Sequence, residues 1–191
     1  MRIAVIGTGH IGGTLGSKWR AAGHDVVYGA RRGAAVGPGG APVAAIGNAV
    51  QDAEVVVLAI PGGAVAGTAK EYATALAGKT VVDATNNMGG AAPDSRAAIT
   101  GAVPDVRYVR AFNTLGWENF ADPLPGAALF FAAEPSARQA TEKLIQAVGL
   151  EPVYVGGPDA TGTVDALLPL WFELVKLNGG NRKVALGILR G

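Results

Sequence analysis

The first dozen residues constrain the fold of this chain more than any other segment. Ile3 to Ile6 form a short apolar run of the kind found in buried parallel strands. Gly7, Gly9 and Gly12 follow at G-x-G-x-x-G spacing. Apolar residues then recur at helical intervals, at Ile11, Leu15, Trp19 and Ala22. The segment therefore predicts a strand, a tight glycine turn and a helix in direct succession.

Glycines in that context predict a site for a dinucleotide. Gly7 allows a tight turn, Gly9 lets the backbone approach a pyrophosphate, and Gly12 lets the helix lie close to the strand. The N-terminus of the helix offers free N–H groups and a partial positive charge to phosphates. The alternative is a purely structural glycine turn, and the strand and helix on either side favour the binding site.

The residues after the second predicted strand, Asp25 to Gly29, indicate which dinucleotide is bound. NAD-specific folds usually place an acidic residue there, which bonds the ribose hydroxyls, whereas arginine accommodates a 2′-phosphate. This chain has Ala30-Arg31-Arg32 at that place, and no acidic residue between Asp25 and Asp52. Arginine can bind a phosphate through two hydrogen bonds. NADP(H) is therefore the predicted cofactor, and a solvated basic loop is the alternative.

The rest of the chain alternates between apolar runs and amphipathic segments. Further strands are expected at residues 54–60, 80–83, 106–111, 127–133 and 152–155, and helices at 43–50 and 136–148. This order predicts an α/β protein with a Rossmann-type doubly wound, mainly parallel sheet, formed by residues 1–191 as a single domain. Ligands of such sheets bind beyond the carboxyl ends of the strands. The loops at 7–12, 30–32, 60–62, 84–87 and 113–116 are therefore expected to meet at one crevice.

Residues 159–191 form a tail of different character. Apolar side chains surround almost the whole helix expected there, which predicts burial on several sides, by the same chain or by a second subunit in a homodimer. The Asn178-Gly-Gly-Asn181 sequence ends this helix, and residues 184–189 add a last apolar piece.

Composition excludes several classes of function. The chain has 191 residues, a formal net charge of +1 and no block of Lys or Arg, so nucleic acid and anionic membranes are not expected partners. It has no cysteine, which excludes thiolate nucleophiles and zinc–cysteine sites, and no other metal-ligand spacing occurs. No apolar run approaches the length of a membrane span, and the first strand begins at once. We expect a cytoplasmic protein.

With these motifs, the chain resembles the coenzyme F420-dependent NADP oxidoreductases. The glycine motif, Ala30-Arg31-Arg32, Ile60-Pro61, Asp165-Ala-Leu-Leu-Pro-Leu and Leu177-Asn-Gly-Gly180 carry the resemblance, which runs nearly end to end. It implies hydride transfer between NADPH and the deazaflavin F420, or a flavin, as second ligand. The residues that it implies around NADP are Gly7, Thr8, Gly9, His10, Ile11, Gly12, Ala30, Arg31, Arg32, Ile60, Pro61 and Ala84. Those near the second ring are Asn113, Thr114, Leu177, Asn178, Gly179 and Gly180.

The loop residues show no set of side chains that would act as acid, base or nucleophile. Hydride transfer between stacked rings needs proximity and orientation above all. His10 is expected to contact the cofactor, and Asp83 to be a structural carboxylate. Asn86 and Asn87 would either bond a ligand carboxamide or serve as turn residues. No catalytic residue is therefore assigned.

The acceptor remains open to alternatives. An NADPH-dependent flavin, quinone, imine or carbonyl reductase, or a non-catalytic NADPH sensor, would share the N-terminal motif. The partner in each enzymatic case is a small-molecule hydride acceptor. For the tail, we expect the Leu177–Gly180 turn to help bind the second ring, because its glycines leave space for a flat ring and Asn178 offers both a donor and an acceptor. A plain helix end is the alternative.

Overall fold

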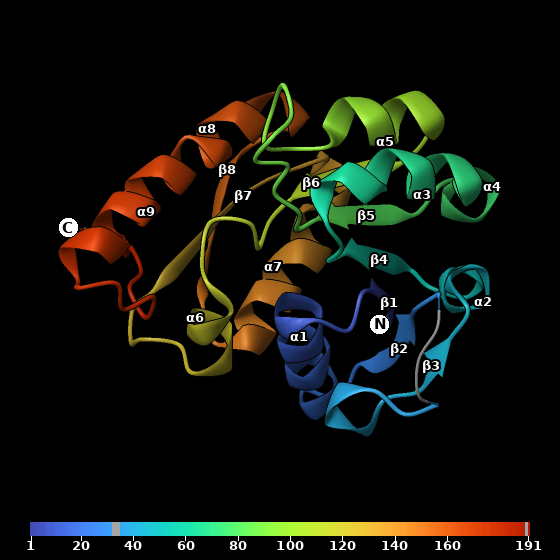
Figure 1. Cartoon of the computed structure of the whole chain (residues 1–191), viewed down its shortest axis with the longest axis horizontal. Coiled ribbons are helices and arrows are strands. Elements are labelled where there is room, and N and C mark those ends of the chain that lie inside the picture. Colours follow the sequence, from blue (N-terminus) through green and yellow to red (C-terminus); the bar gives the residue numbers. More distant parts are fainter. Residues whose placement is uncertain (32–34, 190) are drawn as a thin grey trace.

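A single eight-stranded sheet forms the centre of the molecule (Figure 1). The computed structural model describes residues 1–31, 35–189 and 191. The strand order is β3-β2-β1-β4-β5-β6-β7-β8, and all neighbouring pairs are parallel except β6 and β7. The strands are β1 Arg2–Ile6, β2 Asp25–Gly29, β3 Val43–Ala44, β4 Val55–Leu58, β5 Thr80–Asp83, β6 Arg107–Arg110, β7 Ala128–Ala133 and β8 Glu151–Gly156. The predicted doubly wound α/β fold is confirmed.

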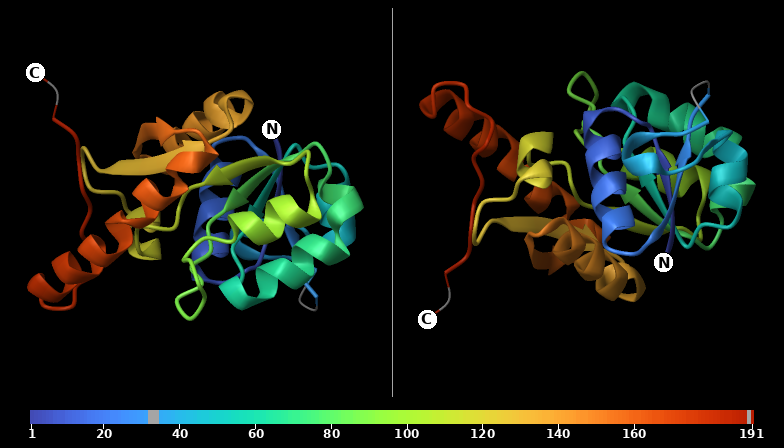
Figure 2. Two further views of the ribbon diagram at one scale, coloured as in Figure 1. Left: turned by 90° about the horizontal axis from the view of Figure 1, so that it is seen from above. Right: turned by 90° about the horizontal axis from the view of Figure 1, so that it is seen from below.

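Helices cover both faces of this sheet (Figures 1 and 2). Side chains of α1, α6 and α7 belong to the apolar cluster on one face, and those of α2, α3, α4 and α5 to the cluster on the other. In α9, Leu167 and Trp171 meet Ala128 and Phe130, which lie on the face of β7 opposite to Leu129 and Phe131. The α-helices are α1 His10–Ala21, α2 Ile46–Gln51, α3 Val65–Glu71, α4 Ala73–Leu76, α5 Arg96–Ala102, α6 Trp117–Ala121, α7 Arg138–Val148, α8 Thr161–Asp165 and α9 Leu167–Leu177. Short 3-10 turns lie at Pro38–Gly40, Gly62–Ala64, Pro135–Ala137 and Pro158–Ala160.

Buried strands in the middle of the sheet explain the continuous apolar runs of the sequence. In β1, Ile3 and Val5 point into one cluster while Ala4 and Ile6 point into the other. A strand covered on both faces needs apolar side chains at every position, which removes the polar alternation seen at a surface. The same holds for β4, all of whose residues are buried.

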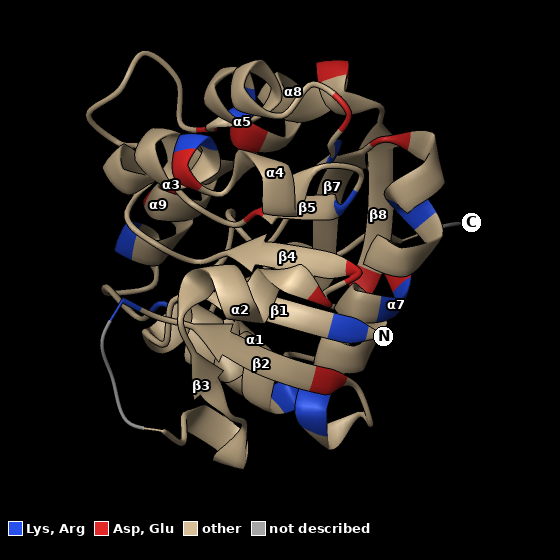
Figure 3. Cartoon of the chain, turned by 90° about the vertical axis from the view of Figure 1, so that its right-hand side faces the viewer, with Lys and Arg blue, Asp and Glu red and all other residues tan. Residues whose placement is uncertain are grey.

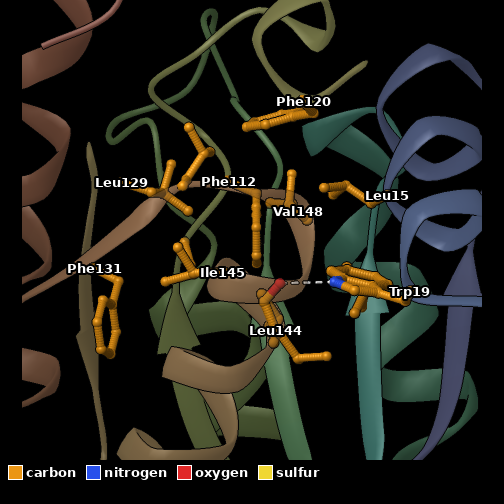
Figure 4. Close-up of a cluster of buried hydrophobic side chains, with 14 of the residues drawn as sticks. Leu15, Trp19, Phe112, Phe120, Leu129, Phe131, Leu144, Ile145 and Val148 are labelled. Atoms are coloured by element: carbon orange, nitrogen blue, oxygen red, sulfur yellow. Dashed lines mark hydrogen bonds between the residues drawn. The ribbon is translucent and has the colours of Figure 1, made fainter. Parts of the chain in front are cut away.

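Aromatic side chains join α1 to the helices beside it (Figure 4). Trp19 is fully buried, and its indole Nε1 donates a hydrogen bond to the carbonyl oxygen of Leu144 in α7 at 2.9 Å. Phe112 meets Trp19 and Phe120 edge to face, at 5.6 and 5.8 Å between ring centroids. This cluster fixes α1, and therefore the glycine loop at its start, against α6 and α7.

The buried indole gives a test of this packing. We expect Trp19→Phe to lower the free energy of unfolding by about 1–3 kcal/mol, because it removes the Nε1 hydrogen bond and leaves a void. Urea unfolding followed by circular dichroism measures the change. A midpoint equal to that of the wild type would show that the Trp19–Leu144 contact does not hold α1 in place.

One element expected from the sequence is corrected by the structure. The helix expected over residues 43–50 is instead β3, which pairs with Tyr28 and Gly29, followed by α2 from Ile46. The strand expected over 106–111 is β6, and β7 runs antiparallel to it. The short apolar runs of these segments suit strand and helix equally, so only pairing with a neighbouring strand decides between them.

The prediction of a tail helix buried on several sides is wrong for the single chain. The tail forms two helices, and α9 buries one stripe, made of Leu168, Trp171 and Val175. Leu170 and Leu177 are 46% and 84% exposed. The helix lies at the edge of the molecule beside β7 and β8, so only one of its faces meets the sheet (Figures 1 and 2).

Figure 3 shows Lys and Arg interspersed with Asp and Glu along the ribbon of the chain. This pattern agrees with the low formal net charge of +1. Within the described residues, no helix is both long and apolar enough to cross a membrane.

Candidate functional site

Two glycines of the N-terminal motif are required by the geometry of the turn after β1. Gly7 has a φ of +112°, and a Cβ there would lie 2.3 Å from the carbonyl oxygen of Ala59. A Cβ on Gly12 would lie 2.2 Å from the carbonyl oxygen of Gly7. Any side chain at either position would therefore push β1, α1 and the end of β4 apart.

Gly9 differs from these two glycines because it faces open space. Its backbone is extended, at φ −71° and ψ −171°, and among the described residues no atom lies within 4 Å of a Cβ built on it. Gly9 is also the N-cap of α1, whose first turn holds no acidic residue and no side-chain cap. The free N–H groups of such a helix end suit an anion. The loop therefore fits the pyrophosphate of a dinucleotide.

A pocket of about 720 Å³ lies beside this loop, at the carboxyl ends of β1 and β2. Its lining combines the glycine loop with the exits of β2 and β4, as expected for one crevice. The lining residues are Ile6, Gly7, Thr8, Gly29, Ala30, Arg31, Ile46 and Ile60. Arg31 is exposed at the rim, where its guanidinium can meet a ligand phosphate. Arg32, the second predicted arginine, lies outside the described residues.

A second hollow of about 640 Å³ lies on the α1 side of the loop, lined by Thr8, Gly9, His10 and further residues of α1. The His10 imidazole stacks on Trp117, with 5.2 Å between ring centroids and an interplanar angle of 21°. Trp117 begins α6 and is 36% exposed, so this ring is a surface group rather than a core residue. The pair forms an aromatic wall beside the glycine loop.

The exits of β4, β5 and β6 also meet. A Cβ on Gly62 would lie 2.7 Å from Cα of Asn87, which places the Ile60–Pro61 exit against the loop after β5. Asn86 of that loop donates through Nδ2 to the carbonyl oxygen of Asn113 at 2.8 Å. Its Oδ1 accepts from Arg110 at 3.1 Å, so both ends of the Asn86 amide are bonded within the protein. Asn86 therefore shapes the loop, with one donor and one acceptor position of its amide engaged within the protein.

The predicted residues Ala84, Asn113 and Thr114 lie in these exits but are almost fully buried, at 7%, 2% and 4% exposure. Phe112, just before Asn113, has a φ of +63°, a conformation that costs free energy for a bulky side chain. Strained backbone at a strand exit is typical of functional sites. Among the described residues that line the two pockets beside the glycine loop, none of the three predicted residues is present.

Sequence reasoning missed the two groups that organise these exits, Arg110 and Asp165. Arg110 is fully buried, and its Nη2 lies 2.7 Å from Oδ1 of Asp165, in the tail helix α8. Burial raises the pKa of the Asp165 carboxyl, although the Arg110 charge opposes this shift. The available signals were an arginine amid the apolar residues of a strand and the place of Asp165 at the start of the Asp165-Ala-Leu-Leu-Pro-Leu motif.

Asp83 is the structural carboxylate that the sequence indicated. It is fully buried and accepts hydrogen bonds from the backbone N–H and hydroxyl of Thr85, from the N–H of Ser95 and from Tyr108. Burial, together with the Asp83 charge, raises the pKa of Tyr108 well above its ordinary value. Among the described residues, no group of three His, Cys, Asp or Glu side chains is arranged to bind a metal ion.

The tail meets the crevice with its beginning and not with its end. Asp165 contacts the exit of β6, whereas the predicted Leu177–Gly180 turn is exposed, and a Cβ on Gly179 or Gly180 would have no described atom within 4 Å. In both Figures 1 and 2, α6 lies between this turn and α1. None of the four residues of this turn is among the described residues that line the two pockets beside the glycine loop. A role of the turn in binding a second ring stays a prediction.

Residues 2–87 match the family model described as NADP oxidoreductase, coenzyme F420-dependent. Over these residues the chain is similar to that family, and residues 88–191 lie outside the match. The resemblance drawn from the motifs is thereby confirmed, and the family's NADP binding agrees with the cofactor predicted from the exit of β2. The matched segment contains the glycine loop, Arg31 and the exit of β4.

Solved structures extend the similarity beyond residue 87. A candidate F420-dependent NADP-reductase from Arthrobacter sp. FB24 is 24% identical, with a TM-score of 0.84 and full coverage of both chains. A hypothetical protein from Sinorhizobium meliloti is 27% identical, with a TM-score of 0.75. The match covers 100% of this chain and 96% of that protein. Pyrroline-5-carboxylate reductase from Coxiella burnetii is 18% identical, with a TM-score of 0.68 and coverage of 93% and 68%. The first and third matches, below 25% identity, show the fold alone.

Proposed function

We propose that this protein transfers hydride between NADPH and a ring-shaped acceptor, the deazaflavin F420. One observation carries the NADPH half of the proposal: Gly7 and Thr8 of the glycine loop line the same pocket as Arg31, and Gly9, next in the loop, faces open space. The loop provides backbone N–H groups for the pyrophosphate, and Arg31 provides a charge for the 2′-phosphate. These residues would hold the cofactor, which supplies the hydride.

The acceptor half of the proposal rests on the family and on the shape of the site. The family is described as coenzyme F420-dependent, and the exits beside the crevice carry backbone and amides in place of an acid–base pair. Transfer between two stacked rings needs alignment and exclusion of water, which such rigid loops supply. The aromatic wall of His10 and Trp117 offers a flat surface next to the loop.

An imine or carbonyl reductase is the second candidate. It is favoured by the similarity of fold to pyrroline-5-carboxylate reductase, but this chain spans only 68% of that protein. Reduction of an imine also needs a proton donor at the site. Among the described residues that line the second hollow, His10 and Lys18 are the titratable side chains, and either could donate a proton.

Turnover of NADPH tests the proposal. Purified protein is mixed with NADPH and, in separate reactions, F420, FMN, FAD, a quinone and a cyclic imine, and the nicotinamide absorbance band is followed. Oxidation of NADPH with F420 supports the proposal. Oxidation only with the imine supports the second candidate, and binding of NADPH without turnover of any acceptor indicates a sensor.

A further inference from the structure

The buried guanidinium of Arg110 connects three separate parts of the chain. It donates through Nη1 to the carbonyl oxygens of Asp83 and Thr85, at 3.2 and 2.6 Å. It donates through Nη2 to Oδ1 of Asn86, at 3.1 Å, and through Nε to Oδ1 of Asp165, at 2.8 Å. The exit of β5 and the tail helix α8 are therefore both bonded to one residue of β6.

Asp165 extends this network to the exit of β6. The same Oδ1 atom accepts a hydrogen bond from Nδ2 of Asn113 at 2.9 Å. The carbonyl oxygen of Asn113 in turn accepts from Asn86, which closes a ring of contacts between the two exits. Each amide is thereby held in one orientation, next to the strained backbone of Phe112.

The free-energy cost of burying these charges indicates that the network serves more than stability. Arg110 is 0% and Asp165 7% exposed, and desolvating two charges costs several kcal/mol per ion. Apolar residues of similar volume would often stabilise a fold equally well. Two buried acceptors, Oδ1 of Asn113 and Oδ2 of Asp165, also have no hydrogen-bond partner among the described residues. The sheet exit therefore keeps a polar network that packing alone does not require.

We propose that Arg110 and Asp165 are positioning residues for the nicotinamide end of the crevice. They fix the loops around Thr85 and Asn113, against which the nicotinamide ring lies during hydride transfer. The inference rests on the proposed function, and it assigns part of the site to the tail, through α8. The phosphate end, formed by Gly9 and Arg31, has no contact with this network among the hydrogen bonds and ion pairs of the described residues.

Asp165→Ala tests this assignment with two ligands that differ only at one end. NADPH carries the nicotinamide, whereas 2′-phospho-ADP-ribose has the phosphates without it. Calorimetry measures the affinity of both, the emission of bound NADPH reports the surroundings of the nicotinamide, and kcat with F420 reports alignment. We expect the affinity for 2′-phospho-ADP-ribose to stay within about twofold, while kcat falls about tenfold to a hundredfold and the NADPH emission changes.

Two further variants separate positioning from folding. Asp165→Asn keeps an oxygen that can accept from Arg110 and Asn113, so its kcat is expected between those of the wild type and the alanine variant. Asn86→Ala, at a half-buried residue, removes the bonds to Asn113 and Arg110 while Arg110 keeps its ion pair with Asp165, and it should show the same split if Asp165→Ala does not fold. Asp159→Asn is the control, because that exposed carboxylate pairs only with Arg96 outside the crevice.

The inference is overturned if kcat and NADPH emission of the folded Asp165 and Asn86 variants equal those of the wild type. It is also overturned if the variants lose affinity for both ligands together with thermal stability, since that pattern reflects a general destabilisation of the fold. Wild-type protein that binds neither ligand contradicts the proposed function itself. If wild-type protein binds NADPH but does not reduce F420, kcat cannot be compared. The emission of NADPH bound to the variants then tests the positioning role.

Discussion

Gly9→Val is expected to lower the affinity for NADPH by about a hundredfold or more without unfolding the protein. The valine side chain would occupy the open space in front of the loop and separate its N–H groups from the pyrophosphate. Charge-assisted hydrogen bonds are worth about 1.5–3 kcal/mol each, so losing two of them accounts for this factor. Calorimetric titration with NADPH measures the change.

The backbone of Gly9 makes this variant a clean test. Its φ of −71° and ψ of −171° suit any residue, so the thermal midpoint should hardly move. Gly67→Val is the matched control, since Gly67 also faces open space but lies in α3, outside the lining of both pockets. If the Gly9 variant binds NADPH as tightly as the wild type, this loop does not bind the pyrophosphate.

Arg31→Ala is expected to weaken NADPH binding about tenfold to a hundredfold and to leave the affinity for NADH nearly unchanged. The side chain lies at the exit of β2, where the 2′-phosphate of NADP is bound in folds of this type. One charge-assisted contact contributes about 1.5–3 kcal/mol, and exposure of Arg31 to solvent favours the lower value.

Titrations of both dinucleotides at two salt concentrations test this assignment. The preference for NADPH should shrink at high salt in the wild type and be small at any salt in the variant. Arg96→Ala, which removes an exposed arginine paired with Asp159, controls for a general change of surface charge. Equal affinities of the wild type for NADPH and NADH would remove the basis for the predicted cofactor.

Local sequence patterns were sufficient for the first strand, the glycine turn and the first helix. The apolar run of β1, the glycine spacing and the helical period of α1 all act over a few residues, so propensity and periodicity capture them. The position of Arg31 follows from the end of β2 and from the parallel order of the sheet. These residues form the lining that the sequence predicted for the phosphate end.

The Arg110–Asp165 network could not be predicted in the same way. Arg110 and Asp165 are 55 positions apart, and nothing in either local segment indicates that they pair. The antiparallel direction of β7 depends on how the chain returns to the sheet after α6, which no strand pattern encodes. The apolar tail was misjudged because composition does not show which face of α9 meets the sheet.

Direct hydride transfer is tested most directly with NADPH that carries deuterium at C4 of the nicotinamide, prepared in both stereochemical forms. The labelled cofactor is incubated with the protein and F420, and reduced F420 is analysed by mass spectrometry. Because a deazaflavin accepts hydride at carbon, the label does not exchange with water. We predict that one of the two forms delivers its deuterium to F420. Unlabelled product from both forms, or NADPH that stays unoxidised with F420, would contradict this account.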